Sequence, residues 1–375
     1  MDSQNIVEHF RDMPDPREDN RRHLLIDIIV IVICASICGA EKWEDIEVFG
    51  NSREKWLRRF LRLPHGIPSH DTFARVFAML DPGALNERFV SWVAMVNPLE
   101  GGQLINIDGK TVRGSHDRGK GKQAIHMVSA WANEAGLTLG QRKVDEKSNE
   151  ITAIPELLDM LELAGCVVTI DAMGTQTAIA EKISDNGGDY VLALKGNQST
   201  LHDDVKLYLQ DIEGDVETQQ KCEYNKTVEK DHGRIEVREC WATEDIEWLQ
   251  QKGSWKGLKS ICMIKAMRII GEEDTEECRY YISSLPAEAE GLSRTIRAHW
   301  GVENSLHWVL DVAYREDECR KRKGHSAENF AILRHLTLNL LKLEKTCKRS
   351  IAGKRLLAGW DPEYMEKVLF HAQMR

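Results

Sequence analysis

Apolar positions in the first hundred residues recur at helical spacing. An apolar run covers residues 24–38, a helical pattern follows over 43–60, and a further helix is expected over 72–80. The apolar run is shorter than a membrane-spanning helix, which needs about 20 residues, and we interpret it as a buried helix of a globular domain. The pattern predicts an all-helical N-terminal domain over residues 1–97. Its helix–break–helix arrangement leaves two roles open, DNA binding and plain core packing.

The pattern changes from residue 101, where short apolar segments typical of strands begin. The predicted strands cover residues 104–108, 125–132, 137–144, 166–170 and 189–194, with helices at 154–164 and 175–184 between the later ones. Three consecutive strands followed by alternating helices and strands predict a mixed sheet covered by helices, which is an α/β fold.

The remaining residues are predicted to complete this second domain, which covers residues 98–345. Residues 199–289 are less regular and are interpreted as a β-rich insertion. Their predicted elements are a polar helix at 201–209 and strands at 234–241 and 258–270. Helices are expected again over 292–312 and 326–345, and residues 346–375 are predicted to form a basic C-terminal tail.

Two of the predicted strands end on an aspartate that is followed within a few residues by glycine. Asp108 stands in INIDGKTVRG and Asp171 in CVVTIDAMG. A carboxylate at the end of a buried strand is costly unless it has a partner, and two strands of one sheet can present both carboxylates at one edge. Hard divalent cations such as Mg²⁺ take ligands of this kind. Either aspartate alone is also consistent with a turn residue or a helix N-cap.

A third acid, Glu303, lies on a predicted helix. On a helix its side chain projects together with Trp300 and His307, which are three and four residues away. The alternative interpretation is an ordinary surface glutamate. The combination with Asp108 and Asp171 favours a site built from three carboxylates.

Charge and cysteine content narrow the functional classes. The formal net charge is −10, so a nucleic-acid-binding surface would need local positive charge. Residues 313–355 contain twelve Lys or Arg against five Asp or Glu, with the densest run at 320–323. Such a run is typical of a solvated loop and is also suited to phosphate binding. The nine cysteines are scattered without metal-binding spacing, which fits a reducing compartment, and no signal-peptide pattern is present, so we expect a cytoplasmic protein.

Several motifs along the chain resemble one family of mobile-element proteins. The matching segments are PDPR (14–17), IDGKTVRGS (107–115), IDAMGTQ (170–176), LKGNQ (194–198), HGRIEVR (232–238), HWGVENSLHWVLDV (299–312) and GKRLLAGWD (353–361). Their content and order resemble the ISAs1 insertion-sequence family, which includes the H-repeat-associated proteins and belongs to the DDE transposases. The resemblance covers essentially the whole chain and implies a ribonuclease-H-like catalytic domain with a β-rich insertion.

The resemblance also implies a chemistry. Asp108, Asp171 and Glu303 would be both the catalytic triad and the ligands of two Mg²⁺ or Mn²⁺ ions. The expected activity is phosphodiester cleavage and strand transfer at the terminal inverted repeats of an insertion sequence and at target DNA. Such a protein is expected to act as a homo-oligomer on DNA and to associate with the nucleoid when acting. Two alternatives stay open, an inactive relic that only binds DNA and another ribonuclease-H-like nuclease.

Positive and polar residues near these acids are the candidates for DNA contacts. The related IS4-like transposases carry Tyr, Arg and Lys around their glutamate, whereas this chain has Ile296, His299 and Leu310 at those positions, so that signature is not carried over. Asp311 is a possible extra acid near the site. The predicted DNA contacts are Lys110, Arg113, Lys195, Asn197, Arg297, His299, Asn304, Arg320, Lys321, Arg322 and Lys323.

Overall fold

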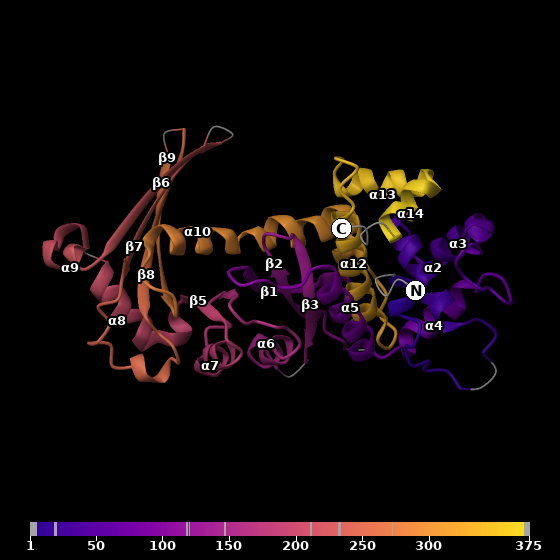
Figure 1. Cartoon of the computed structure of the whole chain (residues 1–375), viewed down its shortest axis with the longest axis horizontal. Coiled ribbons are helices and arrows are strands. Elements are labelled where there is room, and N and C mark those ends of the chain that lie inside the picture. The colour runs from indigo at the N-terminus through magenta and orange to yellow at the C-terminus, as the bar shows by residue number, and fades with distance from the viewer. Residues whose placement is uncertain are drawn as a thin grey trace.

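A sheet of nine strands extends from one end of the molecule to about its middle in the computed structural model, and helices form the other end (Figure 1). The structure describes residues 6–18, 21–117, 119, 121–145, 148–210, 212–231, 234–271 and 273–370. The strands are β1 (Leu104–Val112), β2 (Ile125–Ala132), β3 (Leu137–Val144), β4 (Val167–Ile170), β5 (Asp189–Leu194), β6 (Glu223–Asp231), β7 (Arg234–Thr243), β8 (Ser260–Ile270) and β9 (Glu273–Ser283). Their order in the sheet is β3-β2-β1-β4-β5-β9-β8-β7-β6.

The central strands are parallel and the flanking ones antiparallel. β1 pairs in parallel with β4, and β4 pairs in parallel with β5. β2 and β3 continue the sheet from β1 in antiparallel order, while β9 continues it antiparallel from β5. Helices α6 (Glu150–Leu158) and α7 (Thr177–Asp185) connect the parallel strands. The mixed α/β sheet expected from the hydrophobic pattern is therefore confirmed.

The first aspartate does not end its strand. Residues 104–108 were expected as the strand, but β1 continues through Asp108 to Val112, because β2 supplies an antiparallel partner as far as the pair Val112 and Ile125. β4 ends at Ile170, which is opposite Ile107. Asp108 therefore lies where β1 extends beyond β4, and the expectation of a strand end at Asp108 is wrong.

Residues 199–289 contain more strand than the sequence pattern indicated. Helices α8 (Ser199–Leu209) and α9 (Val216–Gln220) precede strands β6 to β9, and β6 and β9 were not predicted. Their strands continue the central sheet through the pairing of β9 with β5. His232 and Gly233 of the HGRIEVR motif lie outside the described residues.

The long helix expected over 292–312 is interrupted. Helix α10 (Ala289–His299) runs from the insertion toward the middle of the molecule (Figure 1). A π-helical segment, Glu303–His307, follows and leads into α11 (Trp308–Tyr314). π-Helical turns are rare and occur frequently at functional sites.

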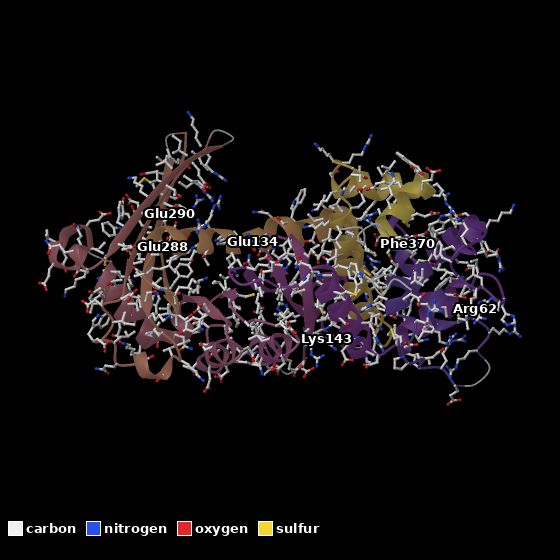
Figure 2. All side chains as sticks on the ribbon, viewed as in Figure 1. Arg62, Glu134, Lys143, Glu288, Glu290 and Phe370 are labelled. Carbon is white, nitrogen blue, oxygen red and sulfur yellow. The ribbon has the colours of Figure 1, made fainter. Side chains whose placement is uncertain are left out.

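The described part of the N-terminal region is helical, as predicted, and packs with the C-terminal helices. The N-terminal helices are α1 (Ile6–His9), α2 (Leu25–Ile37), α3 (Trp43–Leu57), α4 (His70–Met79) and α5 (Pro82–Val96), and the C-terminal ones are α12 (Ser326–Leu343), α13 (Ile351–Trp360) and α14 (Pro362–Phe370). Figure 2 shows Arg62 and Phe370 at the same end of the molecule. Helix α2 is apolar on all sides and almost wholly buried, as a central core helix should be. No helix within the described ranges is long and apolar enough to cross a membrane.

Part of the segment expected as a basic tail is folded. Residues 351–370 form α13 and α14, and residues 371–375 lie outside the described part of the chain. Lys354 and Arg355 are buried, and each donates to backbone carbonyls near the C-terminus of another helix, at Leu341 O (2.8 Å) and Ser36 O (2.9 Å). Cations at helix C-termini satisfy free carbonyls and the helix dipole, so these two positive charges stabilise the fold.

Candidate active site

The three predicted acids line one pocket. Asp108 comes from β1, Asp171 from the turn after β4, and Glu303 from the π-helical segment. The pairing of Ile107 with Ile170 brings the two aspartates, one residue further along each chain, to the same edge of the sheet. The pocket has a volume of about 290 Å³ and is also lined by Lys195 and His299.

Backbone amides hold both aspartates. Asp108 Oδ1 accepts from the N–H of Gly109 (2.9 Å), and Asp171 Oδ1 accepts from Met173 N (3.0 Å) and Gly174 N (3.3 Å). Thr175 Oγ1 donates to Asp171 O (3.1 Å) and to Ala193 O (2.7 Å), which ties this turn to β5. Asp171 thus acts as a turn residue and also faces the pocket, so the two interpretations of this aspartate are compatible.

His307 lies between two of the acids. Its Nδ1 is 3.5 Å from Asp108 Oδ2 and 3.7 Å from Glu303 Oε2. One ligand atom from each of these three residues lies within 4.8 Å of the others. His307 is only 6% exposed, and its Nε2 has no hydrogen-bond partner among the described residues. Burial, with Lys110 nearby, lowers the pKa of His307 to about 4, so the imidazole is neutral and does not compensate the acids.

The acids repel one another. Burial raises the pKa of Asp108 to about 7, opposed by the Gly109 hydrogen bond and reinforced by the charges of Glu303, Asp171 and Glu150. Burial and the charge of Glu150 also raise the pKa of Asp171, while its two backbone hydrogen bonds and Lys195 oppose this shift. The pocket therefore concentrates negative charge in a partly desolvated place, which a bound cation would relieve.

Glu150 was not predicted as a site residue. It is the first residue of α6, and its Oε1 is 2.6 Å from His126 Nε2 on β2. His126 Nδ1 is in turn 2.8 Å from Thr111 Oγ1 on β1. The helix was expected over 154–164, so Glu150 was placed outside it. The signal that finds the true start is Asn149, an N-cap followed at once by an acid, whose Oδ1 accepts from Ile151 N (3.1 Å).

The positive residues expected at the sheet edge differ in their surroundings. Lys110 is enclosed by acids, with Nζ at 2.7 Å from Asp311 Oδ1, 3.5 Å from Asp317 Oδ1 and 3.7 Å from Glu316 Oε2. The nearby Arg113 is exposed. Lys110 therefore neutralises carboxylates of the protein, and its expected role as a phosphate contact conflicts with this enclosure.

The polar residues after β5 and β4 also divide into two kinds. Lys195 is exposed and lines the pocket. Asn197 Nδ2 donates to Ala172 O (2.5 Å), which holds the turn that carries Asp171. Asn197 thus positions the acid turn.

The predicted contacts near Glu303 are likewise mixed. His299 is half-buried at the wall of the pocket, where its Nδ1 is 2.8 Å from Thr169 Oγ1, and burial lowers its pKa to about 4. This contact fastens the end of α10 to β4. Arg297 is exposed and pairs with Glu229 (3.2 Å), and Asn304 is exposed.

The basic run at 320–323 is only partly available to a ligand. Arg320 and Lys323 are exposed, whereas Arg322 is half-buried and donates from Nε to Gly114 O (3.2 Å). The Lys321 side chain is buried, with Nζ 3.9 Å from the Phe330 ring centroid and a hydrogen bond to Glu41 O. The prediction that Lys321 contacts DNA conflicts with this burial, because its ammonium is occupied by the protein itself.

Comparison with known proteins identifies the class. Residues 100–340 match the family described as "Transposase DDE domain", and residues 7–93 match the one described as "DDE_Tnp_1-associated". The chain belongs to the DDE transposase family. Proteins with this domain use divalent metal ions in general, and the ribonuclease-H-like α/β fold implied by the sequence motifs is confirmed.

Similar proteins extend over nearly the whole chain. "Putative transposase YncI" of Escherichia coli O157:H7 is 42% identical over 98% of this chain and 95% of that protein. "H repeat-associated putative transposase YhhI" of Escherichia coli K12 is 41% identical over 98% of each chain, in agreement with the resemblance found in the motifs. A cryo-EM structure of the piggyBac transposase synaptic complex with hairpin DNA aligns with 99% of this chain and 76% of that chain, at 10% identity and a TM-score of 0.41.

Proposed function

We propose that this DDE-type transposase cuts DNA at the terminal inverted repeats of an insertion sequence and joins the ends to target DNA. Asp108, Asp171 and Glu303 are the catalytic carboxylates. The observation that carries the proposal is that these three acids line one pocket, although they come from a strand, a turn and a π-helical segment that are far apart in the sequence. Family membership supports the same chemistry.

The residues of the pocket fit a hard divalent cation. Carboxylate oxygens are the ligands that Mg²⁺ and Mn²⁺ prefer, and the half-buried Asp108 and Asp171 and the exposed Glu303 have no compensating charge from the neutral His307. We assign Asp108, Asp171 and Glu303 as ligands of two such ions. Bound ions of this kind supply charge stabilisation to a phosphoryl group and lower the pKa of an attacking hydroxyl.

The chain itself orients the acids and the DNA. Amides of the turn after β4 fix one oxygen of Asp171, and His307 packs against Asp108 and Glu303 from the buried side. Lys195 lies at the pocket rim, where its charge can meet a phosphate. The proposed DNA contacts that are exposed are Arg113, Lys195, Arg297, Asn304, Arg320 and Lys323. We assign protein-internal contacts to Lys110, Asn197, His299, Lys321 and Arg322.

The test is metal-dependent cleavage of DNA that carries the sequences flanking the gene. Wild type should cut in Mg²⁺ or Mn²⁺, and Asp171→Asn should bind the same DNA without cutting it. Asp159→Asn is the matched control, because Asp159 is an exposed aspartate at the end of α6 that pairs with Lys182 (2.6 Å) away from the pocket. Binding without cutting by wild type would favour an inactive relic. Equal cutting by Asp171→Asn and wild type would refute the assignment.

A further inference from the structure

A second recess, distinct from the acid pocket, lies between the insertion and α10. It is a groove of about 480 Å³ lined by strands β7, β8 and β9 on one side and by α10 on the other. Figure 1 shows the hairpins of the insertion rising above α10. Five arginines line it: Arg234, Arg238, Arg268, Arg279 and Arg297. We call this recess the arginine groove.

The arginines are held in place by few acids. Glu236, which is 7% exposed, accepts from Arg234 Nε (2.8 Å), lies 3.5 Å from Arg268 Nη2 and also pairs with Arg238. Glu229 pairs with Arg238 (2.8 Å) and Arg297 (3.2 Å).

Arg279 has an acid of its own, Glu277, at 2.7 Å. Among the described residues, five guanidinium groups therefore share three carboxylates, which leaves an excess of two positive charges in a chain whose net charge is −10.

The ion pairs leave the guanidinium groups with N–H donors that can form further hydrogen bonds. Each guanidinium has five N–H donors in a fixed plane, and its geometry matches phosphate oxygens. Glu236 sits opposite Arg268 in the β7–β8 register, so it holds its arginine partners on one face of the sheet. A face that presents several oriented guanidinium groups is suited to a polyanion with regularly spaced phosphates.

The groove shares part of its wall with the acid pocket. Arg279, Trp300 and Glu277 line both recesses, and the Arg279 guanidinium lies 4.8 Å from the Trp300 ring centroid. The register explains the contact: β9 pairs with β5 only from Tyr280 to Ser283, so its earlier residues extend beyond the end of β5 at which Lys195 follows. A DNA strand bound at the three acids would therefore contact Arg279 as it leaves the pocket.

We propose that the arginine groove binds the phosphate backbone of the DNA segment adjoining the cut. The proposal rests on the proposed function, since it takes DNA as the ligand of the neighbouring pocket. The groove and the pocket share lining residues, and DNA is the proposed ligand of the pocket. This favours DNA over an acidic protein as the ligand of the groove, because binding of an acidic protein would not account for the three carboxylates next to it. A purely structural ion-pair network is the competing account.

The test removes two exposed guanidinium groups and measures DNA binding. The variant Arg234→Gln with Arg268→Gln is compared with wild type on a fluorescein-labelled duplex carrying the gene's flanking sequence, over a series of salt concentrations. Each lost phosphate contact should lower the salt slope of log K by about 0.9 and weaken binding about tenfold at moderate salt. Glu229→Gln, which removes a competing acid, should tighten binding.

The matched control lies on the opposite face of the same sheet. Lys226 pairs with Glu239, and Lys265 is opposite Glu239 in the register. Both lysines therefore lie on the face of the sheet opposite to Arg238 and Arg268. Lys226→Gln with Lys265→Gln also removes two positive charges, and it should leave affinity and salt slope near wild type. Equal losses of DNA affinity in both double variants would indicate a general effect of charge and would refute the proposal that the groove binds DNA.

The outcomes separate this proposal from the proposed function. Wild type that cuts DNA, together with an arginine double variant that binds DNA as wild type does, refutes the groove and leaves the function standing. Wild type that neither binds nor cuts DNA refutes both. Melting temperatures report on folding, and if the double variant melts early, the single variant Arg297→Gln, whose exposed guanidinium pairs with the exposed Glu229, carries the same test.

Discussion

Gly109 lies directly after Asp108, and a methyl group there has no room. A Cβ at this position would be 2.5 Å from His126 Nε2 and closer still to Glu150 Oε1, whereas real Cβ contacts are essentially never shorter than 3.0 Å. The N–H of Gly109 also holds Asp108 Oδ1. The substitution Gly109→Ala must therefore separate Glu150 from His126 or shift β1 and, with it, Asp108.

The size of the effect follows from these contacts. Loss of the hydrogen bond between His126 and Glu150 costs about 1–3 kcal/mol of unfolding free energy, offset by about 0.4–1 kcal/mol because alanine restricts the unfolded chain. Stability should thus fall by about 1 kcal/mol. A displacement of a catalytic group by about 1 Å can cost about a hundredfold in rate, so the cleavage rate should fall by far more than stability.

The assay measures single-turnover cleavage at saturating DNA, together with DNA affinity and melting temperature. Gly101→Ala is the matched control, since a Cβ at Gly101, just before β1, meets nothing within 4 Å. Glu150→Ala should also cut slowly, and combining it with Gly109→Ala should add little, because both remove the same contact. Cleavage by Gly109→Ala at the wild-type rate would refute the argument that Glu150 and His126 support Asp108.

Three further variants test other parts of the site. His307→Ala should reduce cleavage about a hundredfold and raise the Mn²⁺ concentration needed for it, because the two acids lose the side chain between them; an unchanged metal dependence would contradict this. Asp108→Asn should make the metal-free protein more stable at neutral pH. The pKa of Asp108 is about 7 in the folded protein, against an ordinary value of 3.8, so ionisation of this carboxyl destabilises the fold increasingly from about pH 4 to pH 7, by at most about 4 kcal/mol. The stability gained by Asp108→Asn, measured in denaturant titrations, should therefore disappear below about pH 4. Lys321→Ala should lower the free energy of unfolding by about 2 kcal/mol and leave DNA affinity unchanged, whereas Arg320→Gln should weaken binding without destabilising the fold.

Strands with clear alternation or an apolar run could be predicted from the sequence. The ranges 125–132, 137–144 and 189–194 agree with β2, β3 and β5. By contrast, β6 is mostly charged, and the first six residues of β9 are exposed and mostly charged. These segments are strands because they pair with β7 and β8, whereas only the end of β9, at Tyr280, Tyr281 and Ile282, buries apolar side chains. Pairing with other strands can override the local hydrophobic pattern, and a short segment of sequence does not show which strand will be its partner.

The candidate site could be predicted only in part for the same reason. Asp108 and Asp171 were singled out as aspartates at the ends of predicted strands and Glu303 as an acid on a predicted helix, and the motif resemblance implied that the three form a triad. The parallel register of β1 and β4 accounts for the placement of the two aspartates at one edge of the sheet. Glu150 and His126 are 24 positions apart in the sequence, on a helix and a strand. Their contact depends on how α6 packs on the sheet, which the sequence pattern does not reveal. Burial of Lys321 is equally invisible, because a run of four basic residues looks the same whether it faces water or an aromatic ring.

The edge of the sheet explains why the acids and the arginine groove are neighbours. β4 and β5 stop at this edge, whereas β1 continues past it on one side and β9 extends past it on the other. The two short strands leave a recess, and the two long ones form its sides. Asp108 and Asp171 face that recess from β1 and the turn after β4, and β9 contributes Arg279 from the opposite side. Because β9 is paired with β5, the position of the insertion is set by sheet hydrogen bonds, so the groove is held at a constant distance from the carboxylates without a separate domain interface.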